Sequence, residues 1–172
     1  MKTAGQTAET WPNLVEMFFD QAERRGKRAM LHAKVGGAWR ATAWAEAAQQ
    51  VATLATALNA RGIGKGARVV LVSENRPEWC IADLAIMAAG AITVPTYTTN
   101  TERDHLHILE NSGAKAAIVS NAKLAKVLLP AVYRSTNCRQ VIGMETLRLG
   151  QASGAELLDW SALMAAHTGD VP

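Results

Sequence analysis

The strongest signal for the fold class is the segment 68-RVVLVSENRPEWCIADLAIMAAGAITVP-95. It begins with the continuous apolar run RVVLVS, which is typical of strands buried inside parallel sheets. Pro77 suits the start of a helix, because the N–H that proline lacks would have no partner there. The helix predicted over 78–89 is apolar nearly all round, so we expect it to be heavily buried. A second strand is predicted over 91–94, and we expect Pro95 to end it.

Downstream of this stretch the same alternation of helix and strand continues. Apolar periodicity and end signals predict a helix capped by Thr101 or Asn100 and a second helix capped by Asn121. Gly113 ends the first of these helices. The predicted elements are helix 102–111, strand 116–120, helix 121–134, strand 139–144 and, where the pattern has weakened, a short helix at 161–166.

Upstream, Asn13 is predicted to cap a helix over 14–25, and Thr42 to cap a second helix that Gly62 stops. Between them, the strands 29–35 and 38–41 flank the turn residues Gly36-Gly37 and predict a β-hairpin. The alternation predicts an α/β fold, with a mostly parallel doubly wound sheet and helices on both faces. We expect residues 1–145 to form a partial α/β subdomain and residues 146–172 to be a connector.

Composition excludes several classes of protein. With 49% hydrophobic residues and a net charge of +3, the 172-residue chain is neither disordered nor strongly basic. The densest basic cluster, residues 24–28, is interpreted as a solvated surface in preference to a nucleic-acid site. No Cys/His zinc spacing occurs, and Cys80, in an apolar stretch, is interpreted as a small buried hydrophobe in preference to a nucleophile. Asp83 could be a structural or a functional acid, and the structural role is favoured.

Two patterns that resemble ligand sites are better explained structurally. Gly62-x-Gly64-x-Gly66 ends a helix and enters a strand, whereas a phosphate-binding fingerprint follows a strand and opens a helix. His105 and His107, two apart on a predicted helix, point to opposite sides and cannot share a metal ion there. We therefore predict no metal site and no catalytic residue in this chain.

Two loops are left as candidate binding segments, since each follows a strand and precedes a helix. In open parallel sheets, ligands bind beyond the carboxyl ends of the strands. The alternative is that these loops hold ordinary turn and capping residues. The candidate substrate-channel residues are Asn75, Arg76, Tyr97, Thr98, Thr99 and Asn100.

An ordered set of short motifs runs through residues 62–121 and, more weakly, from Trp11 to Met144. It comprises Trp39, Ala43, Trp44 and Glu46, then Leu58, Gly62, Ile63 and Gly66, then the run 75–79, then 82–85, Gly90-Ala91, Val94-Pro95 and 112–115. This set resembles the N-terminal part of the adenylate-forming enzymes, in particular the long-chain fatty acyl-CoA synthetases. Ala67 and Thr98 depart from the family pattern, which more often has Asp and Pro at these positions.

The resemblance implies a ligase that joins a fatty acid to CoA through an acyl-adenylate, with ATP, Mg²⁺ and CoA needed by the full-length enzyme. The phosphate loop, the acidic residue and the C-terminal lysine of that family do not occur here. We therefore expect an inactive N-terminal fragment that binds no cofactor itself, has the remainder of its own chain as partner, and self-associates if apolar surface is exposed. The alternative is a free-standing α/β binding or interaction module; a nucleotide-binding protein with a dinucleotide fingerprint is less favoured.

The sequence also bears on location. No apolar signal-peptide core precedes Trp11, and the longest apolar run is interrupted by Asp83, Gly90 and Pro95. We expect a cytoplasmic protein without a transmembrane segment. A peripheral contact with the inner membrane face through Arg24–Arg28 remains an open alternative.

Overall fold

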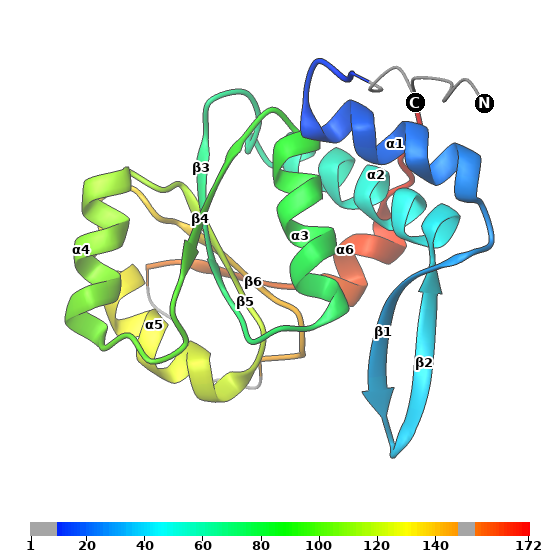
Figure 1. The fold of residues 1–172 in the computed structure, drawn as a ribbon. Helices are drawn as coiled ribbons and strands as arrows, with labels where there is room; N and C mark the ends of the chain where they lie inside the picture. The colour runs from blue at the N-terminus through cyan, green and yellow to red at the C-terminus, as the bar shows by residue number, and fades with distance from the viewer. Residues whose placement is uncertain (1–9, 148–153) are drawn as a thin grey trace, which may run out of the picture.

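The structure is a computed structural model that describes residues 10–147 and 154–172. Within this part of the chain, a five-stranded sheet has the spatial order β4-β3-β5-β6-β7 and every neighbouring pair is parallel (Figure 1). The strands are β3 (Arg68–Val72), β4 (Ile92–Thr96), β5 (Ala116–Val119), β6 (Gln140–Gly143) and β7 (Glu156–Asp159). The predicted doubly wound α/β class is confirmed.

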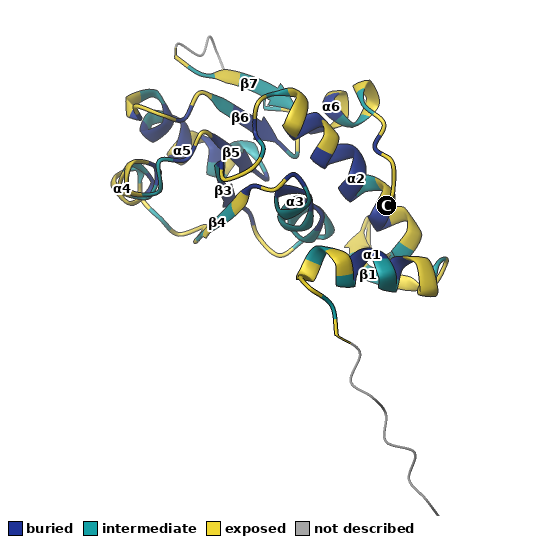
Figure 2. Ribbon diagram, turned by 90° about the horizontal axis from the view of Figure 1, so that it is seen from above, coloured by how far each residue is buried: buried dark blue, intermediate teal, exposed yellow. Residues whose placement is uncertain are grey.

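Helices cover both faces of this sheet (Figure 2). One face packs against α2 (Trp44–Ala60), α3 (Pro77–Ala88) and α6 (Trp160–Ala166), with α1 (Leu14–Arg25) lying on α2 and α3, and the other packs against α4 (Glu102–Ser112) and α5 (Ala122–Arg134). Each face of the sheet has its own hydrophobic core, and alternate side chains of β3 point into one or the other. Leu71 packs into the core on the first face and Val70 into the core on the second, and both are fully buried. Each such side chain contributes roughly 1.5–3 kcal/mol through burial.

A separate two-stranded hairpin, β1 (Ala29–Val35) and β2 (Ala38–Ala43), projects from the body below α1 and α2 in Figure 1. Gly36 and Gly37 have φ values of 58° and 85°, as a type I′ turn requires, so the predicted hairpin is confirmed. The prediction that Thr42 caps α2 is wrong. The hairpin ladder continues to the Ala29–Ala43 pair, so Thr42 is a strand residue and Ala43 takes the cap position without a side-chain bond.

Pro95 does not end β4 as predicted, because it pairs in register with Leu71 inside the strand. The amide of Ile92 donates to Ala67 on the β3 side. The backbone N–H positions of the odd-numbered residues of β4, including Pro95, therefore point toward the open edge of the sheet. The missing N–H of Pro95 falls where no strand is paired, which is where sheets tolerate proline.

The segment after residue 145, where the pattern predicted one short helix, also contributes β7. This strand pairs with β6, with Val141 opposite Leu157, and its four residues are too few to show a periodicity. The predicted helix is present as α6, one residue longer at its start, and Asp159 caps it. The loose stretch 147–155 lies mostly outside the described residues.

Several helix ends and turns agree with the sequence patterns. Asn13, Thr101 and Asn121 cap α1, α4 and α5 through their side chains. Gly62, with φ of 74°, lies in the turn that ends α2 and leads into β3, so this glycine-rich run is structural.

The burial of two helices also agrees with the sequence patterns. On α4, His105 is buried and His107 exposed, which confirms that they point to opposite sides. No residue of α3 is exposed, as its apolar composition predicted.

Candidate functional site

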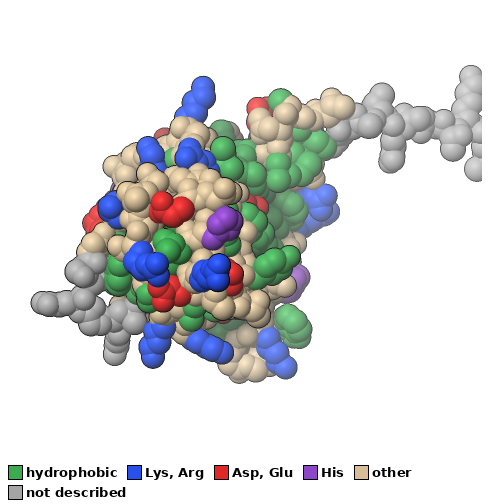
Figure 3. Space-filling model, turned by 90° about the vertical axis from the view of Figure 1, so that its left-hand side faces the viewer, with side chains coloured by type: hydrophobic (Ala, Val, Ile, Leu, Met, Phe, Trp, Pro, Cys, Tyr) green, Lys and Arg blue, Asp and Glu red, His purple; other side chains and the backbone are tan. Residues whose placement is uncertain are grey.

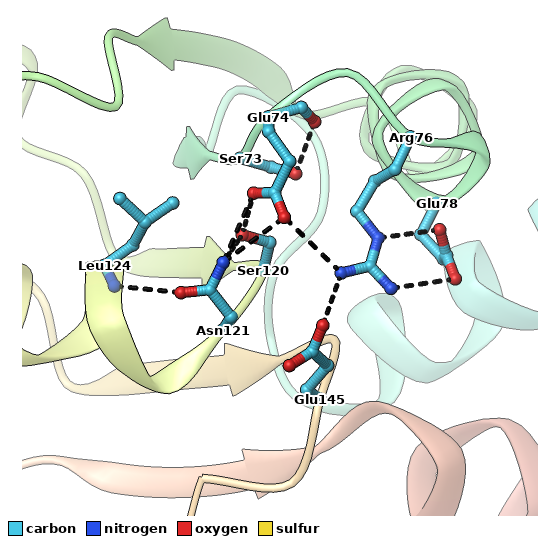
Figure 4. Close-up of polar contacts among 8 residues, drawn as sticks. All are labelled: Ser73, Glu74, Arg76, Glu78, Ser120, Asn121, Leu124 and Glu145. Carbon is cyan, nitrogen blue, oxygen red and sulfur yellow. Dashed lines mark hydrogen bonds and ion pairs between the residues drawn. The ribbon is translucent and has the colours of Figure 1, made fainter. Parts of the chain in front are cut away.

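A polar cluster lies where β3, β5 and β6 end, at one edge of the sheet (Figure 4). We call it the carboxyl-edge cluster, and its members are Glu74, Arg76, Glu78, Ser120, Asn121 and Glu145. The chain runs from β3 to β4 on one side and then returns to place β5 on the other side of β3. Such a reversal leaves a crevice beyond the strand ends, which is the usual ligand site in open α/β sheets.

Arg76 is the central cation of the cluster. Its Nε and Nη2 donate to the two carboxylate oxygens of Glu78 at 2.8 and 3.2 Å, and its Nη1 donates to Glu145 at 2.8 Å. Glu74 lies 3.8 Å from Nη1. The hydrogen bonds that Arg76 donates to Glu78 are the main cause that holds the pKa of Arg76 above its ordinary value. Arg76 thereby ties the start of α3 to the segment after β6.

Glu74 and Asn121 connect β3 to β5. The Glu74 carboxylate accepts hydrogen bonds from the Ser120 hydroxyl and from Asn121 Nδ2. Asn121 Oδ1 meanwhile accepts from the backbone N–H of Leu124 at 3.0 Å and so caps α5. Partial burial raises the pKa of Glu74, but the hydrogen bonds led by Ser120 outweigh it, and the pKa lies below its ordinary value.

The pKa of Glu78 is set in the same way. Burial raises it, and the stronger combined effect of the Arg76 hydrogen bonds and charge lowers it below the ordinary value. Both acids are therefore ionised at neutral pH. Three carboxylates surround one guanidinium, so the cluster keeps a negative balance even with Arg76 at its centre.

An open groove of about 940 Å³ separates the cluster from the β1–β2 hairpin. Two predicted site residues, Asn75 and Arg76, line it, together with Glu74, Glu78, Glu145 and Cys80. Burial, then the charge of Asp83, raises the pKa of the Cys80 thiol. Cys80 is half-buried and not fully buried as predicted, and a protonated thiol is a poor nucleophile.

The second predicted loop lies elsewhere. Tyr97, Thr98 and Thr99 are exposed, Tyr97 by 79%, and Asn100 is half-buried with its N–H donating to the Tyr97 carbonyl at 3.3 Å. None of these four is among the groove-lining residues of the described chain. The structure thus brings one predicted loop and Glu78, at the start of α3, together with three residues from other strand ends that were not singled out as site residues.

Those three residues are Ser120, Asn121 and Glu145. Each comes at or just after the end of a strand that the sequence pattern had predicted, at AAIVS-N and RQVIGM-E. The rule that parallel strands end at one edge applied to them as well as to the loop that holds Asn75 and Arg76. Applied to every strand, that rule would have found them.

The cluster does not fit a nucleotide or its metal ion. A triphosphate at this edge would meet the carboxylates of Glu74, Glu78 and Glu145, and Arg76 is already engaged by them. Across residues 10–147 and 154–172, no group of three His, Cys, Asp or Glu side chains is arranged to hold a metal ion. The contacts of the cluster join the ends of β3, β5 and β6.

None of the helices in the described residues is long and apolar enough to cross a bilayer.

Comparison with known proteins places these features in a family. The model of the AMP-binding enzyme family matches residues 18–166. The long-chain-fatty-acid–CoA ligase FadD15 of Mycobacterium tuberculosis is 36% identical over 102 residues, which are 59% of this chain and 17% of that protein. Human mitochondrial acyl-coenzyme A synthetase ACSM3 is 35% identical over 68 residues, 40% of this chain and 11% of that protein.

Solved structures agree on the fold. The R395G mutant of coronafacic acid ligase from Pectobacterium brasiliense superposes with a TM-score of 0.80 at 16% identity, over 92% of this chain and 30% of that one. The adenylation domain of a carboxylate reductase from Mycobacterium chelonae also superposes with a TM-score of 0.80, at 17% identity. This match covers 96% of this chain and 31% of that one. This chain therefore spans a small part of the proteins it matches. The extent of the family match shows that the chain belongs to the AMP-binding enzymes.

Proposed function

We propose that this chain supplies the N-terminal part of the adenylate-forming domain of a fatty acid–CoA ligase. The observation that carries the proposal is the family match over residues 18–166 together with the 36% identity to a protein named as such a ligase. The complete enzyme would convert ATP, a fatty acid and CoA into acyl-CoA, AMP and pyrophosphate, with Mg²⁺ as metal ion. ATP, Mg²⁺ and CoA would be held by parts of the enzyme other than the carboxyl-edge cluster.

Within such an enzyme we assign this chain a supporting role. Residues 1–145 would be the partial α/β subdomain, and residues 146–172 would lead toward the phosphate-binding region. Asn75 and Arg76 would form one wall of the substrate channel and residues 97–100 another. Since Arg76 is held by Glu78 and Glu145, it would position the wall, while the Asn75 amide is free to face the groove. The site of action would be the cytoplasm.

One experiment tests the supporting role. The purified 172-residue chain is incubated with palmitate, ATP and Mg²⁺, and pyrophosphate is measured against a sample without palmitate. We expect no palmitate-dependent release, because the residues that the chain places at the edge of the sheet repel phosphate. Palmitate-dependent release would contradict the supporting role.

A chimera tests the ligase assignment. The 102-residue stretch of FadD15 that matches this chain is replaced by the corresponding residues of this chain, and palmitoyl-CoA formation is measured. We expect a folded chimera that forms palmitoyl-CoA. The matched control carries Leu71→Asp, which buries a charge in the sheet and should abolish folding and activity together. A chimera that folds but forms no acyl-adenylate would favour a free-standing binding module.

A further inference from the structure

The positive charge of this protein is concentrated in one short segment. Between Glu23 and Glu46 there is no acidic residue, while the segment holds six of the 18 Lys and Arg residues. The other 12 are outnumbered by all 15 Asp and Glu, so the rest of the chain is net negative. The six cations are Arg24, Arg25, Lys27, Arg28, Lys34 and Arg40.

The structure places this segment on a projection. It runs from the end of α1 through the β1–β2 hairpin, which stands away from the body of the molecule (Figure 1). The face formed by α4 and α5, in contrast, interleaves basic and acidic side chains (Figure 3). The charge asymmetry in the sequence is therefore also an asymmetry in space.

The tip of the hairpin combines exposed apolar groups with cations. Trp39 is 72% exposed and Val35 is 52% exposed. Lys34 lies directly opposite Trp39 in the ladder and Arg40 follows it, both exposed. Among the described residues, no ion pair reaches Lys34 or Arg40, so both charges face solvent.

The cations at the base of the hairpin are partly engaged. Arg24 pairs with Asp20 at 3.0 Å, and the Arg25 guanidinium lies 5.2 Å from the Trp44 ring centroid. Lys27 and Arg28 are exposed beside the first strand. The base therefore adds long-range positive potential, while the tip offers groups that can make contact.

We propose that the hairpin tip, residues 34–40, is an arm that binds anionic lipid bilayers. A tryptophan flanked by Lys and Arg matches the membrane interface, where the indole ring lies at headgroup level and the cations bind acidic headgroups. Val35 and Ala38 pair next to the turn Gly36-Gly37, one step beyond the Lys34–Trp39 pair. Glu46, Glu74, Glu78 and Glu145 line the same groove as the hairpin, and the last three are already paired with Arg76.

Nucleic acid is the other anionic surface to consider, and the arm fits it less well. Single-stranded nucleic acid binds to series of aromatic platforms. The arm has one exposed ring, since Trp44 is half-buried against Phe18 and Arg25. The lipid proposal does not depend on ligase activity, so its test is independent of the test of the proposed function.

The test is co-sedimentation of the full chain with vesicles of phosphatidylcholine alone or with 30% phosphatidylglycerol. We expect binding only to the anionic vesicles, and weakening by added salt. Lys34→Gln with Arg40→Gln should weaken binding about 25-fold, since each cation near the surface contributes about fivefold. Trp39→Ser should weaken it several-fold at unchanged charge.

Matched controls separate the arm from general adsorption. Lys123→Gln with Lys126→Gln removes the same charge from exposed positions of α5, and Tyr97→Ser removes an exposed ring elsewhere. Both should bind like the unaltered protein, and circular dichroism checks the fold of each variant. Equal weakening by the α5 pair, or no effect of Trp39→Ser, would overturn the proposal. A lack of binding to the anionic vesicles would also overturn the proposal, whether or not the protein binds a 20-nucleotide single strand.

Discussion

Asn121 Nδ2 donates to both carboxylate oxygens of Glu74, at 3.2 and 3.4 Å, across the point where the sheet reverses its strand order. The same Asn121 side chain caps α5 through Leu124. One amide therefore joins the end of β3, the end of β5 and the start of a helix. Ser120, fully buried, adds its hydroxyl to the same carboxylate.

Replacing Glu74 by Ala should destabilise the protein by about 1–2 kcal/mol, because the buried Ser120 hydroxyl loses its acceptor. Urea unfolding monitored by circular dichroism measures the change. Glu23→Ala removes an exposed acid from α1 and serves as control, with an expected effect within about 0.5 kcal/mol. Equal effects of the two substitutions would show that the cluster adds nothing to stability.

Acid should weaken the fold through Glu74 and Glu78. Their folded pKa values lie below the ordinary 4.5, so the unfolded chain takes up protons first as the pH falls. Their contribution is complete above about pH 4.5 and is lost as the pH falls through the lowered folded values. Urea unfolding across this range should show a shallower decline for Glu74→Gln with Glu78→Gln. A decline as steep as that of the unaltered protein would refute this.

His105 should make stability depend on pH at a higher range. Burial lowers the pKa of His105 below 6.5, against a smaller opposite effect of Asp104, and Nδ1 has no hydrogen-bond partner. The unfolded chain therefore binds the proton more readily, so stability is complete above pH 6.5 and falls as the pH drops toward the lowered value. His105→Leu should remove this slope in thermal unfolding. His107→Leu, at an exposed position, should keep it, and the reverse pattern would contradict the assignment.

Gly169→Ala should detach the C-terminal segment from α2. A Cβ at Gly169 would lie 2.2 Å from the carbonyl carbon and oxygen of Ala52. The displacement would break the hydrogen bond from Gln49 to the Gly169 carbonyl at 2.8 Å, at an expected cost of about 1–3 kcal/mol. Hydrogen exchange of residues 167–172 and of Thr53 would report the loss. Thr168→Ala, at the exposed neighbouring position, should leave exchange unchanged.

The regular elements followed from local patterns. Apolar periodicity, capping residues and glycines placed α1 to α6 and β1 to β6, since each signal acts within a few residues of its effect. The misses arose where the deciding contact is distant. Pro95 is tolerated because β4 is an edge strand, with a neighbouring strand on one side only. Strand β7 forms because β6 has an edge with which it can pair.

In the candidate site too, some features followed from local sequence patterns and others from distant contacts. Local sequence signals were enough to predict the fold class and the loop that holds Asn75 and Arg76, and the concentration of positive charge around the hairpin can be read from them too. Contacts between distant segments bring Arg76 to Glu145, 69 residues away, and Ser120 and Asn121 to Glu74. The same packing leaves residues 97–100 outside the groove. The reason is physical: strand order sets which loops become neighbours, and strand order depends on how the helices share the two faces of the sheet.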